Sequence, residues 1–337
     1  MNVTEGIFGD LNGKTIKSYT VKNDHGMEVE CIDYGCTITR IHVPDKDGNI
    51  ENIVLGYDSI EDYQNYSPYF GCIIGRNAGR IKNATFQLEY ERYSLSKNDG
   101  ENNLHSGPNG FHTVIWDSSI QKQEDKVSII FTYTSPDGEE GFPGNLKTTV
   151  AYTINNENQL LITYEAISDK KTIVNLTNHT YFNLSGNPKK PIINHELTLK
   201  SNYFLELDDT FIPTGRKIPV DGTVFDFRSS RLIKDGTESN HPQILLVGGG
   251  YDHPFLLNAN NQEEILLVEK DSGRKLKIET DEPAVILYTG NSLSEKHTGL
   301  CLETQKPPNM INHPEYPTIV LEANQPYHSK TSYTFYI

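Results

Sequence analysis

The sequence is poor in cysteine, methionine, tryptophan and positive charge. Its 337 residues include four Cys, three Met and one Trp, and 30 Lys or Arg stand against 45 Asp or Glu, which gives a formal net charge of -15. No Cys-x-x-Cys pair occurs, which excludes the usual zinc and thioredoxin-like motifs, and free thiols are expected rather than a disulfide framework. Because Lys and Arg do not cluster, the sequence argues against nucleic acids and anionic membranes as partners.

Long apolar runs, targeting signals and repeats are also missing. No apolar stretch approaches the ~20 residues of a membrane span. The segment Met1–Gly9 lacks the basic and apolar regions of a secretory signal, so we expect a cytoplasmic protein. No repeat of 20–50 residues and no low-complexity linker is visible, which disfavours a propeller and indicates a single domain over residues 1–337.

Strand signals dominate what is present. The chain has 19 Tyr and 13 Phe, and short alternating runs are separated by Gly, Asn, Asp and Pro. The predicted strands cover residues 126–133, 148–154, 160–166, 171–176, 275–279, 283–288 and 332–337. Turns are expected at Ser135–Gly138 and Asn155–Asn158, and Ser59 is expected to cap a short helix. The pattern predicts an all-β fold, a single large antiparallel β-sandwich with few short helices.

Two residues are the strongest candidates for chemistry. His179 lies among hydroxyl and amide side chains just beyond a predicted strand. A single histidine in a β protein is more often structural, and its polar flanks weaken that interpretation without removing it. Glu303 lies in the apolar, strand-like run Gly299–Gln305, where burial raises a carboxyl pKa unless donors hold the group ionised. A histidine and a carboxylate at neighbouring strand ends make an acid/base pair.

Other polar groups lie in turn-rich loops. Arg80 ends a glycine-rich segment that is neither a Walker A loop nor a GxGxxG motif. That segment is either a strand corner or a backbone passing close to a ligand under an arginine fork. His105 lies in a polar loop, Asp252 follows three consecutive glycines, and Glu282 precedes the predicted strand 283–288. A metal site built from His and carboxylate groups is conceivable, but no two potential ligands share a short metal-type spacing. The set is instead rich in Arg, Asp, Asn and Tyr, which bind hydroxyl groups.

Six motifs occur together in one order along the chain. They are GRNAGRI (75–81), LHSG (104–107), NLTNHTYFNL (175–184), YDHPF (251–255), YTGN (288–291) and LETQ (302–305). Each motif is weak alone, and six in order are highly specific. On these motifs the chain resembles the aldose 1-epimerases, also called galactose mutarotases, from about residue 30 to the C-terminus.

The resemblance implies a galactose mutarotase-like β-supersandwich that interconverts the α and β anomers of free hexoses such as D-galactose and D-glucose. It implies Glu303 as general base and His179 as general acid, with no metal and no other cofactor. The sugar contacts that it implies are Arg80, His105, Tyr181, Asp252 and Glu282. We expect a monomer or a weak homodimer.

The chain departs from the family pattern at several positions. Gly79 stands where Asn is common, Glu282 where Gln is common, Asn309 where Asp is common and Ser106 where Gly is common. The first two bear on the implied sugar contacts and leave the preferred sugar open, and none of the four changes a catalytic position.

Three alternative functions remain at this point. The first is a hexose-6-phosphate epimerase, for which the Arg80 loop is the only candidate phosphate site, and the second is a carbohydrate-binding module without activity. The third is a metallohydrolase that uses His105, His179 and Glu303.

If Glu303 and His179 form an acid/base pair, their ordinary pKa values are ~4.3 for Glu and ~6.5 for His. These values favour a Glu⁻/His⁺ state near neutral pH, more so where mutual attraction raises the pKa of His179.

Overall fold

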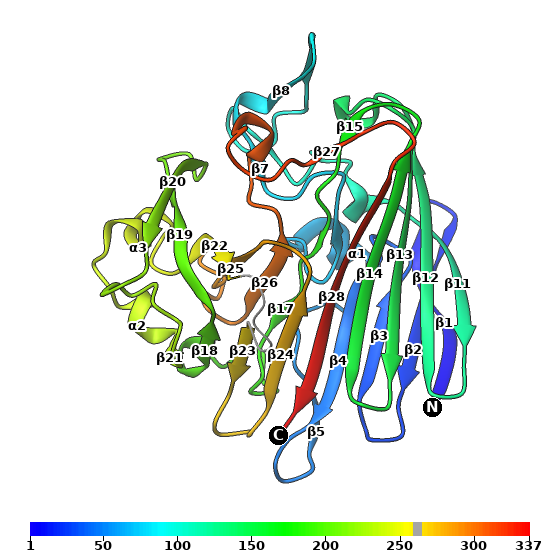
Figure 1. Cartoon of the computed structure of the whole chain (residues 1–337). Coiled ribbons are helices and arrows are strands. Elements are labelled where there is room, and N and C mark those ends of the chain that lie inside the picture. The colour runs from blue at the N-terminus through cyan, green and yellow to red at the C-terminus, as the bar shows by residue number, and fades with distance from the viewer. Residues whose placement is uncertain (259–264) are drawn as a thin grey trace.

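The computed structural model describes residues 1–258 and 265–337. Within these residues the chain is mostly strand, with three short α-helices, and every ladder between its strands is antiparallel. Figure 1 shows these strands stacked in layers, with α2 and α3 at the left edge of the view. The predicted antiparallel β-sandwich with few short helices is therefore confirmed.

The largest sheet has nine strands and forms the front layer in Figure 1. In spatial order its strands are β11 (Asp117–Lys122), β12 (Lys126–Ser135), β13 (Leu146–Asn155), β14 (Gln159–Ser168), β28 (Pro326–Tyr336), β24 (Lys275–Thr280), β23 (Ile265–Val268), β18 (Glu196–Leu199) and β21 (Arg231–Leu232). Buried and partly exposed residues alternate along β13 and β14. This alternation places one face of the sheet on the core and leaves the other face open to water.

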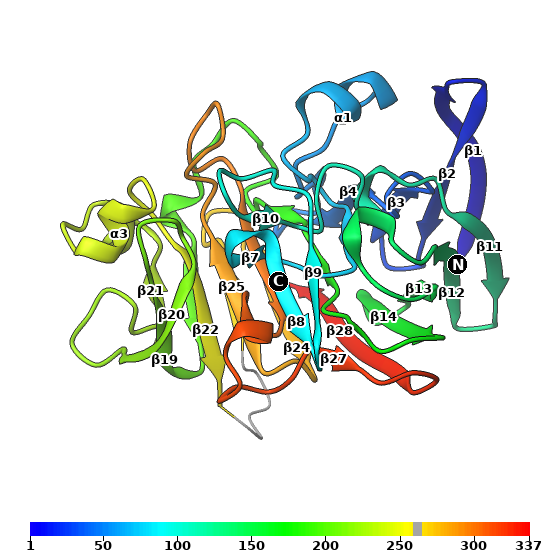
Figure 2. The same cartoon turned by 90° about the horizontal axis from the view of Figure 1, so that it is seen from above.

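Two smaller sheets lie behind the nine-stranded sheet, as Figure 2 shows from above. The five-stranded sheet contains β1 (Asn2–Leu11), β2 (Lys14–Lys22), β3 (Glu28–Ile32), β4 (Ile38–Pro44) and β5 (Ile50–Asn52). The six-stranded sheet runs in the order β17 (Tyr181–Phe182), β26 (Leu300–Gln305), β25 (Ala284–Tyr288), β22 (Asp252–Leu257), β19 (Ser201–Leu207) and β20 (Pro213–Pro219). Apolar residues of all three sheets meet in one buried cluster that includes Val29, Val150 and Phe255.

Short ribbons and helices connect the sheets. The two-stranded ribbons pair β6 (Ile73–Ile74) with β16 (Thr177–Asn178), β7 (Arg80–Ile81) with β10 (Asn103–Leu104), β8 (Thr85–Leu88) with β9 (Glu91–Ser94), and β15 (Thr172–Ile173) with β27 (Val320–Leu321). The α-helices are α1 (Ile60–Tyr66), α2 (Lys234–Thr237) and α3 (Pro242–Leu246). The 3₁₀ turns cover Lys82–Ala84, Phe111–Thr113, Glu139–Gly141, Ile192–Asn194 and Met310–Asn312. None of the helices in residues 1–258 and 265–337 has both the length and the hydropathy that crossing a bilayer requires.

The strands predicted from the sequence agree with the structure at six of seven places. Residues 126–133, 148–154, 160–166, 275–279, 283–288 and 332–337 fall in β12, β13, β14, β24, β25 and β28. The prediction over 171–176 is wrong beyond Thr172–Ile173, because the next backbone donors leave the strand: Val174 bonds to Ile319 and Asn175 bonds to Arg76. The helix prediction is confirmed, since the Ser59 hydroxyl accepts from the Asp62 N–H at 3.1 Å at the start of α1.

Strand β26 connects the core to the candidate site. All six of its residues are buried, because β17 and β25 flank it within its sheet and the other sheets cover it. β25 pairs with β26 along Cys301–Gln305, and β17 pairs with it at Leu300 and Cys301. A buried strand held in this way leaves its side chains little freedom to move. Glu303 lies near the middle of this strand, and the rigid frame sets the direction of its carboxyl group.

Candidate active site

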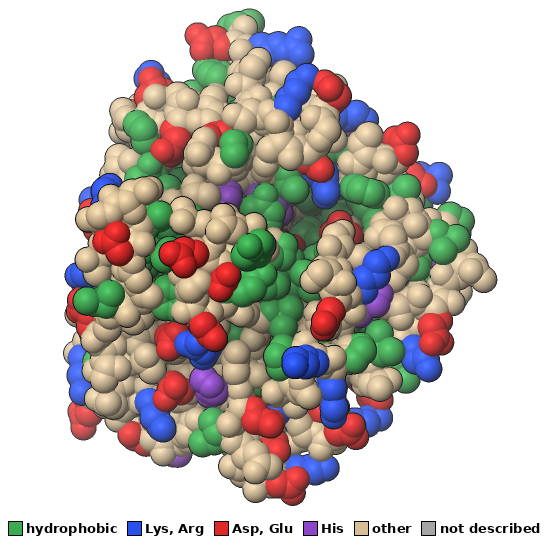
Figure 3. Space-filling view, turned by 180° about the vertical axis from the view of Figure 1, so that it is seen from behind, with side chains coloured by type: hydrophobic (Ala, Val, Ile, Leu, Met, Phe, Trp, Pro, Cys, Tyr) green, Lys and Arg blue, Asp and Glu red, His purple; other side chains and the backbone are tan. Residues whose placement is uncertain are grey.

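A single cavity collects most of the residues that the sequence predicts for function. Its volume is about 220 Å³. The charged, imidazole and amide side chains on its wall are Arg80, His105, His179, Asp252, Glu303 and Gln305. Ser292, three tyrosines and apolar side chains such as Phe211 and Ile286 also line it. In Figure 3 a hollow on the back of the molecule has histidine and acidic side chains at its floor and hydrophobic ones around them. A cavity of this kind is large enough to hold a small-molecule ligand.

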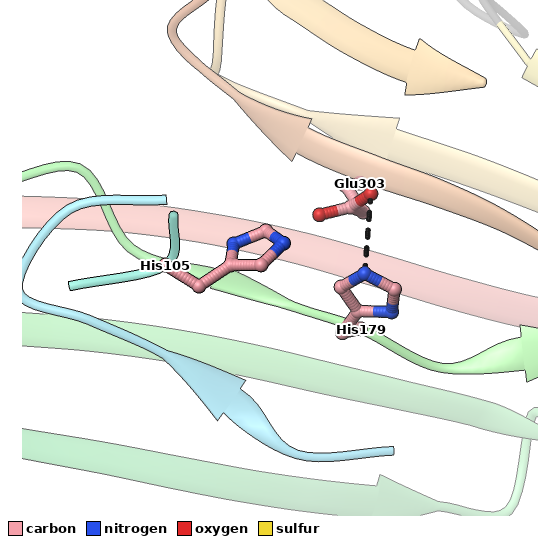
Figure 4. A group of neighbouring side chains, drawn as sticks. All are labelled: His105, His179 and Glu303. Carbon is pink, nitrogen blue, oxygen red and sulfur yellow. Dashed lines mark ion pairs between the residues drawn. The ribbon is translucent and has the colours of Figure 1, made fainter. Parts of the chain in front are cut away.

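His179 and Glu303 face each other inside this cavity. His179 follows β16 directly, and its Nε2 lies 3.6 Å from Oε1 of Glu303 on β26, with both side chains only 5% exposed. The imidazole is held from behind, because its Nδ1 lies 3.4 Å from the Cys301 sulfur and its backbone N–H bonds to Cys72. Figure 4 shows the two groups pointing toward each other from neighbouring strand segments. The predicted juxtaposition of one imidazole and one carboxyl is therefore present.

Burial sets the proton affinities of this pair. Loss of solvent lowers the pKa of His179 to about 4, and loss of solvent together with the nearby Asp252 raises the pKa of Glu303 well above its ordinary value. The prediction that the pKa of His179 is raised is wrong, because burial is the largest influence on this group and lowers its pKa. Burial therefore favours the uncharged form of each group, the neutral imidazole and the protonated carboxyl.

His105 lies beside the pair of His179 and Glu303, and its hydrogen bond to the backbone identifies the tautomer of its ring. Its ring centre is 5.3 Å from that of His179, and its Nδ1 accepts the Gly79 N–H at 3.1 Å. Since Nδ1 is an acceptor, the neutral ring carries its hydrogen on Nε2, which makes this nitrogen a donor. Burial lowers the pKa of His105 well below its ordinary value, so the ring is neutral at physiological pH. A neutral N–H donor of this kind suits a sugar oxygen.

Arg80 and Asp252 come together at one side of the cavity, although 172 positions in the numbering separate them. The Arg80 Nη1 lies 3.9 Å from Oδ2 of Asp252, and the guanidinium carbon lies 5.3 Å from the centre of the Phe211 ring. Burial raises the pKa of Asp252, while the charge of Arg80 opposes that rise. One fork of donors and one carboxylate acceptor can together grip adjacent hydroxyl groups of a sugar.

The two remaining predicted contacts lie differently. Tyr181 of β17 lines the cavity with its ring, but its hydroxyl donates to the Pro68 carbonyl at 3.0 Å. Glu282 is not among the residues that line the cavity; it is buried elsewhere, 3.5 Å from the Lys306 amine and 3.4 Å from the Tyr327 hydroxyl. The predicted sugar contact of Glu282 is thus not supported by the cavity lining, to which the following strand β25 contributes Ile286 and Tyr288.

The donor atoms of His105, His179 and Glu303 also form the one cluster of potential metal ligands found in residues 1–258 and 265–337. They lie within 4.8 Å of one another, and all three side chains are buried. In a tetrahedral zinc site, ligand distances of about 2.0–2.1 Å place donors roughly 3.4 Å apart. The cluster is looser than this, so metal binding would require the three side chains to move closer.

Several residues of the cavity were not predicted. Ile286 is the register partner of Glu303 across β25 and β26, and Phe211 stands under Arg80. The Tyr69 ring contacts both His105 and His179, with centres 4.7 and 5.7 Å apart. Ile286 and Phe211 are apolar, and nothing in the local sequence distinguishes an apolar side chain on a cavity wall from one in the core.

Comparisons with known proteins agree with the resemblance that the motifs indicate. The sequence model of the family described as aldose 1-epimerase matches residues 17–334. Galactose mutarotase of Sus scrofa is 38% identical and aldose 1-epimerase of Escherichia coli (strain K12) is 36% identical, each over 99% of both chains. The crystal structure of galactose 1-epimerase from Lactobacillus acidophilus NCFM superposes with a TM-score of 0.90 at 32% identity, over 99% of this chain and 98% of that one. The chain belongs to the aldose 1-epimerase family.

Proposed function

We propose that this protein is a mutarotase that interconverts the α and β anomers of free hexoses such as D-galactose and D-glucose. The observation that carries the proposal is the buried pair of His179 and Glu303, 3.6 Å apart in a cavity of about 220 Å³. The names of the relatives, galactose mutarotase and aldose 1-epimerase, support the same reaction.

The reaction requires one base and one acid. Glu303, as the carboxylate, removes the proton of the anomeric hydroxyl while His179, as the imidazolium, protonates the ring oxygen through Nε2. The bond between C1 and the ring oxygen then breaks and leaves an open-chain aldehyde. Rotation about the C1–C2 bond turns the other face of the carbonyl toward the ring-forming hydroxyl. The reverse transfers close the ring and return both protons, so no group is consumed.

The shifted pKa values suit these roles. A carboxylate with a raised pKa is a stronger base, and an imidazolium with a lowered pKa is a stronger acid. The form that burial favours, neutral His179 with protonated Glu303, contains the same number of protons as the reactive ionic pair. Moving one proton between the two groups, directly or through the sugar, therefore produces the reactive state without exchange with solvent.

The remaining polar groups hold the sugar while C1 moves. We assign Arg80, Asp252 and the Nε2 hydrogen of His105 to hydroxyl recognition, and the Tyr181 ring to packing against the sugar. Rotation at C1 needs a free anomeric end and fixed hydroxyls elsewhere, which is the positioning role of such groups.

The wider setting of the activity belongs to the proposal as well. We infer that residues 1–337 act as one domain, as a monomer or weak homodimer. We also infer a cytoplasmic location, which is supported by the four cysteines, all of them buried free thiols.

Polarimetry tests the proposed reaction. Purified protein is added to freshly dissolved α-D-galactose and, separately, to α-D-glucose, and the approach to the equilibrium rotation is compared with the spontaneous rate. We expect acceleration proportional to protein concentration for at least one of the two sugars. Rates equal to the spontaneous rate for both sugars, with a correctly folded protein, would reject the proposal.

A further inference from the structure

Arg80 is held by a second carboxylate that lies outside the cavity. Its Nε donates to Oδ2 of Asp99 at 2.6 Å, and this is a shorter contact than the 3.9 Å from Nη1 to Asp252. The guanidinium also lies over the Phe211 ring. The hydrogen bond of Nε to Asp99 and the contact with the Phe211 ring hold the guanidinium in one orientation. In this orientation Nη1 lies on the side of Asp252 and the cavity.

The turn that carries Asp99 is built on the same ribbon as Arg80. Strands β7 and β10 pair Arg80 with Leu104, and the Asn98 side chain closes the intervening turn by bonding to both the N–H and the C=O of Leu104, at 2.8 and 2.9 Å. The backbones of Asp99 and Asn102 bond to each other in both directions. Because both ends of the contact rest on one rigid ribbon, the position of Asp99 relative to Arg80 is fixed by local structure.

The second carboxylate changes the charge that a ligand meets. Among the cavity-lining residues that the structure describes, Arg80 is the one Lys or Arg, and Asp252 and Glu303 are the acidic ones. Asp99 cancels the single positive charge from outside, and its own charge reaches the cavity, since it contributes to the raised pKa of Asp252. His105 and His179 add no positive charge, because burial keeps both neutral at physiological pH.

We propose that Asp99 is a positioning residue for Arg80 and, through its charge, the residue that restricts the cavity to uncharged aldoses. Without Asp99, Arg80 would present a free guanidinium of the kind that binds carboxylates and phosphates in a bidentate manner. With Asp99, an anionic sugar meets a neutralised arginine beside a carboxylate and is rejected. The inference rests on the proposed mutarotase function and adds the class of sugar to it.

The test compares two sugars that differ in one charge. D-Galactose and D-galacturonate share the ring and the anomeric centre, and the second carries a carboxylate at C6. The wild type, Asp99→Asn and the control Glu101→Gln are assayed on both by polarimetry. Glu101 is two positions away on the same turn, and its ion pair with Lys97 lies on the surface. The control therefore removes an equal charge near the site without touching Arg80.

We expect Asp99→Asn to raise KM for D-galactose and to raise the ratio of kcat/KM for galacturonate over galactose by on the order of tenfold, the effect of one unit charge several ångströms away through protein. Glu101→Gln should leave the ratio unchanged, and Asp99→Glu should return it toward the wild-type value. A purely structural role of Asp99 would lower both activities together and leave the ratio fixed. A ratio within about threefold of wild type in folded Asp99→Asn overturns the inference.

The outcomes separate this inference from the proposed function. If wild-type protein does not accelerate mutarotation of any neutral hexose, the mutarotase proposal fails. If it does, and the ratio does not respond to Asp99→Asn, only the role of Asp99 fails. Asp99 is about a third exposed, so folding of the variant is expected, and thermal melting by circular dichroism checks it.

Discussion

Replacing Glu303 by glutamine is the most direct perturbation of the proposed mechanism. Gln has nearly the shape of Glu, so the buried strand β26 keeps its packing and its pairing with β25. The amide accepts and donates hydrogen bonds but does not take a proton at neutral pH. The substitution therefore removes the base and leaves the cavity in place.

The size of the effect follows from the role of the group. General base catalysis contributes roughly 10²- to 10⁴-fold to a rate, which corresponds to about 2.7–5.4 kcal/mol of transition-state stabilisation. The upper part of this range is expected here, because no other carboxylate lies within reach of His179 among the described residues: the ion pair of His179 is with Glu303. KM should change little, since Arg80, His105 and Asp252 still bind the hydroxyls.

The assay is polarimetry of α-D-galactose at saturating sugar, with the spontaneous rate subtracted. Glu279→Gln is the matched control, because Glu279 is a partly exposed carboxylate on β24 that pairs with Lys277 at the surface. The control should retain the wild-type kcat. If folded Glu303→Gln keeps near wild-type kcat, Glu303 is not the base and the proposed mechanism is wrong.

The same variant makes a separate prediction about stability. Burial raises the pKa of Glu303 well above 4.5 in the folded state, so the folded protein holds this proton more tightly than the unfolded chain. The Glu303 carboxyl contributes fully to the free energy of unfolding below its pKa in the unfolded chain, and this contribution is lost as the pH rises toward its pKa in the folded protein. The loss amounts to about 1.4 kcal/mol for each pH unit that separates the two pKa values. Glu303→Gln removes that loss. Its Tm relative to wild type should therefore increase from pH 5 to pH 8, and a Tm difference that stays constant with pH would contradict the assigned pKa direction.

Three further outcomes are expected. The pH profile of kcat/KM should be bell-shaped, with an acid limb near pH 4, where His179 gains a proton, and an alkaline limb where Glu303 loses its proton. The two apparent pKa values belong to the coupled pair, and a profile that is flat from pH 3 to 6 would contradict them. Arg80→Ala should lower kcat/KM by about tenfold to a hundredfold and Arg80→Lys should recover only part, because a point charge does not replace a planar fork; wild-type kinetics in Arg80→Ala would remove Arg80 from the site. Dialysis against a chelator should leave the rate unchanged, whereas a loss restored by one divalent metal would show that His105, His179 and Glu303 hold an ion.

The sequence by itself determined the fold class and most of the candidate site. Alternation along β13 and β14 and the apolar run of β25 are local properties of a strand, so composition and spacing are enough to predict them. His179, His105, Arg80 and Asp252 stand in polar or glycine-rich segments, and Glu303 is a carboxyl group within an apolar strand. The six motifs connected these candidates to one family.

Only the tertiary structure decided how these groups interact. Arg80 on β7 and Glu303 on β26 belong to different sheets, and they line one cavity because the folded chain packs these sheets side by side. No local sequence pattern encodes such packing between distant segments. In the structure Glu282 does not line the cavity, whereas Ile286 does. The structure also reversed the expected protonation of His179, because a pKa depends on how much water the folded chain removes from a group, and burial is a property of the whole fold rather than of the residues beside it in the sequence.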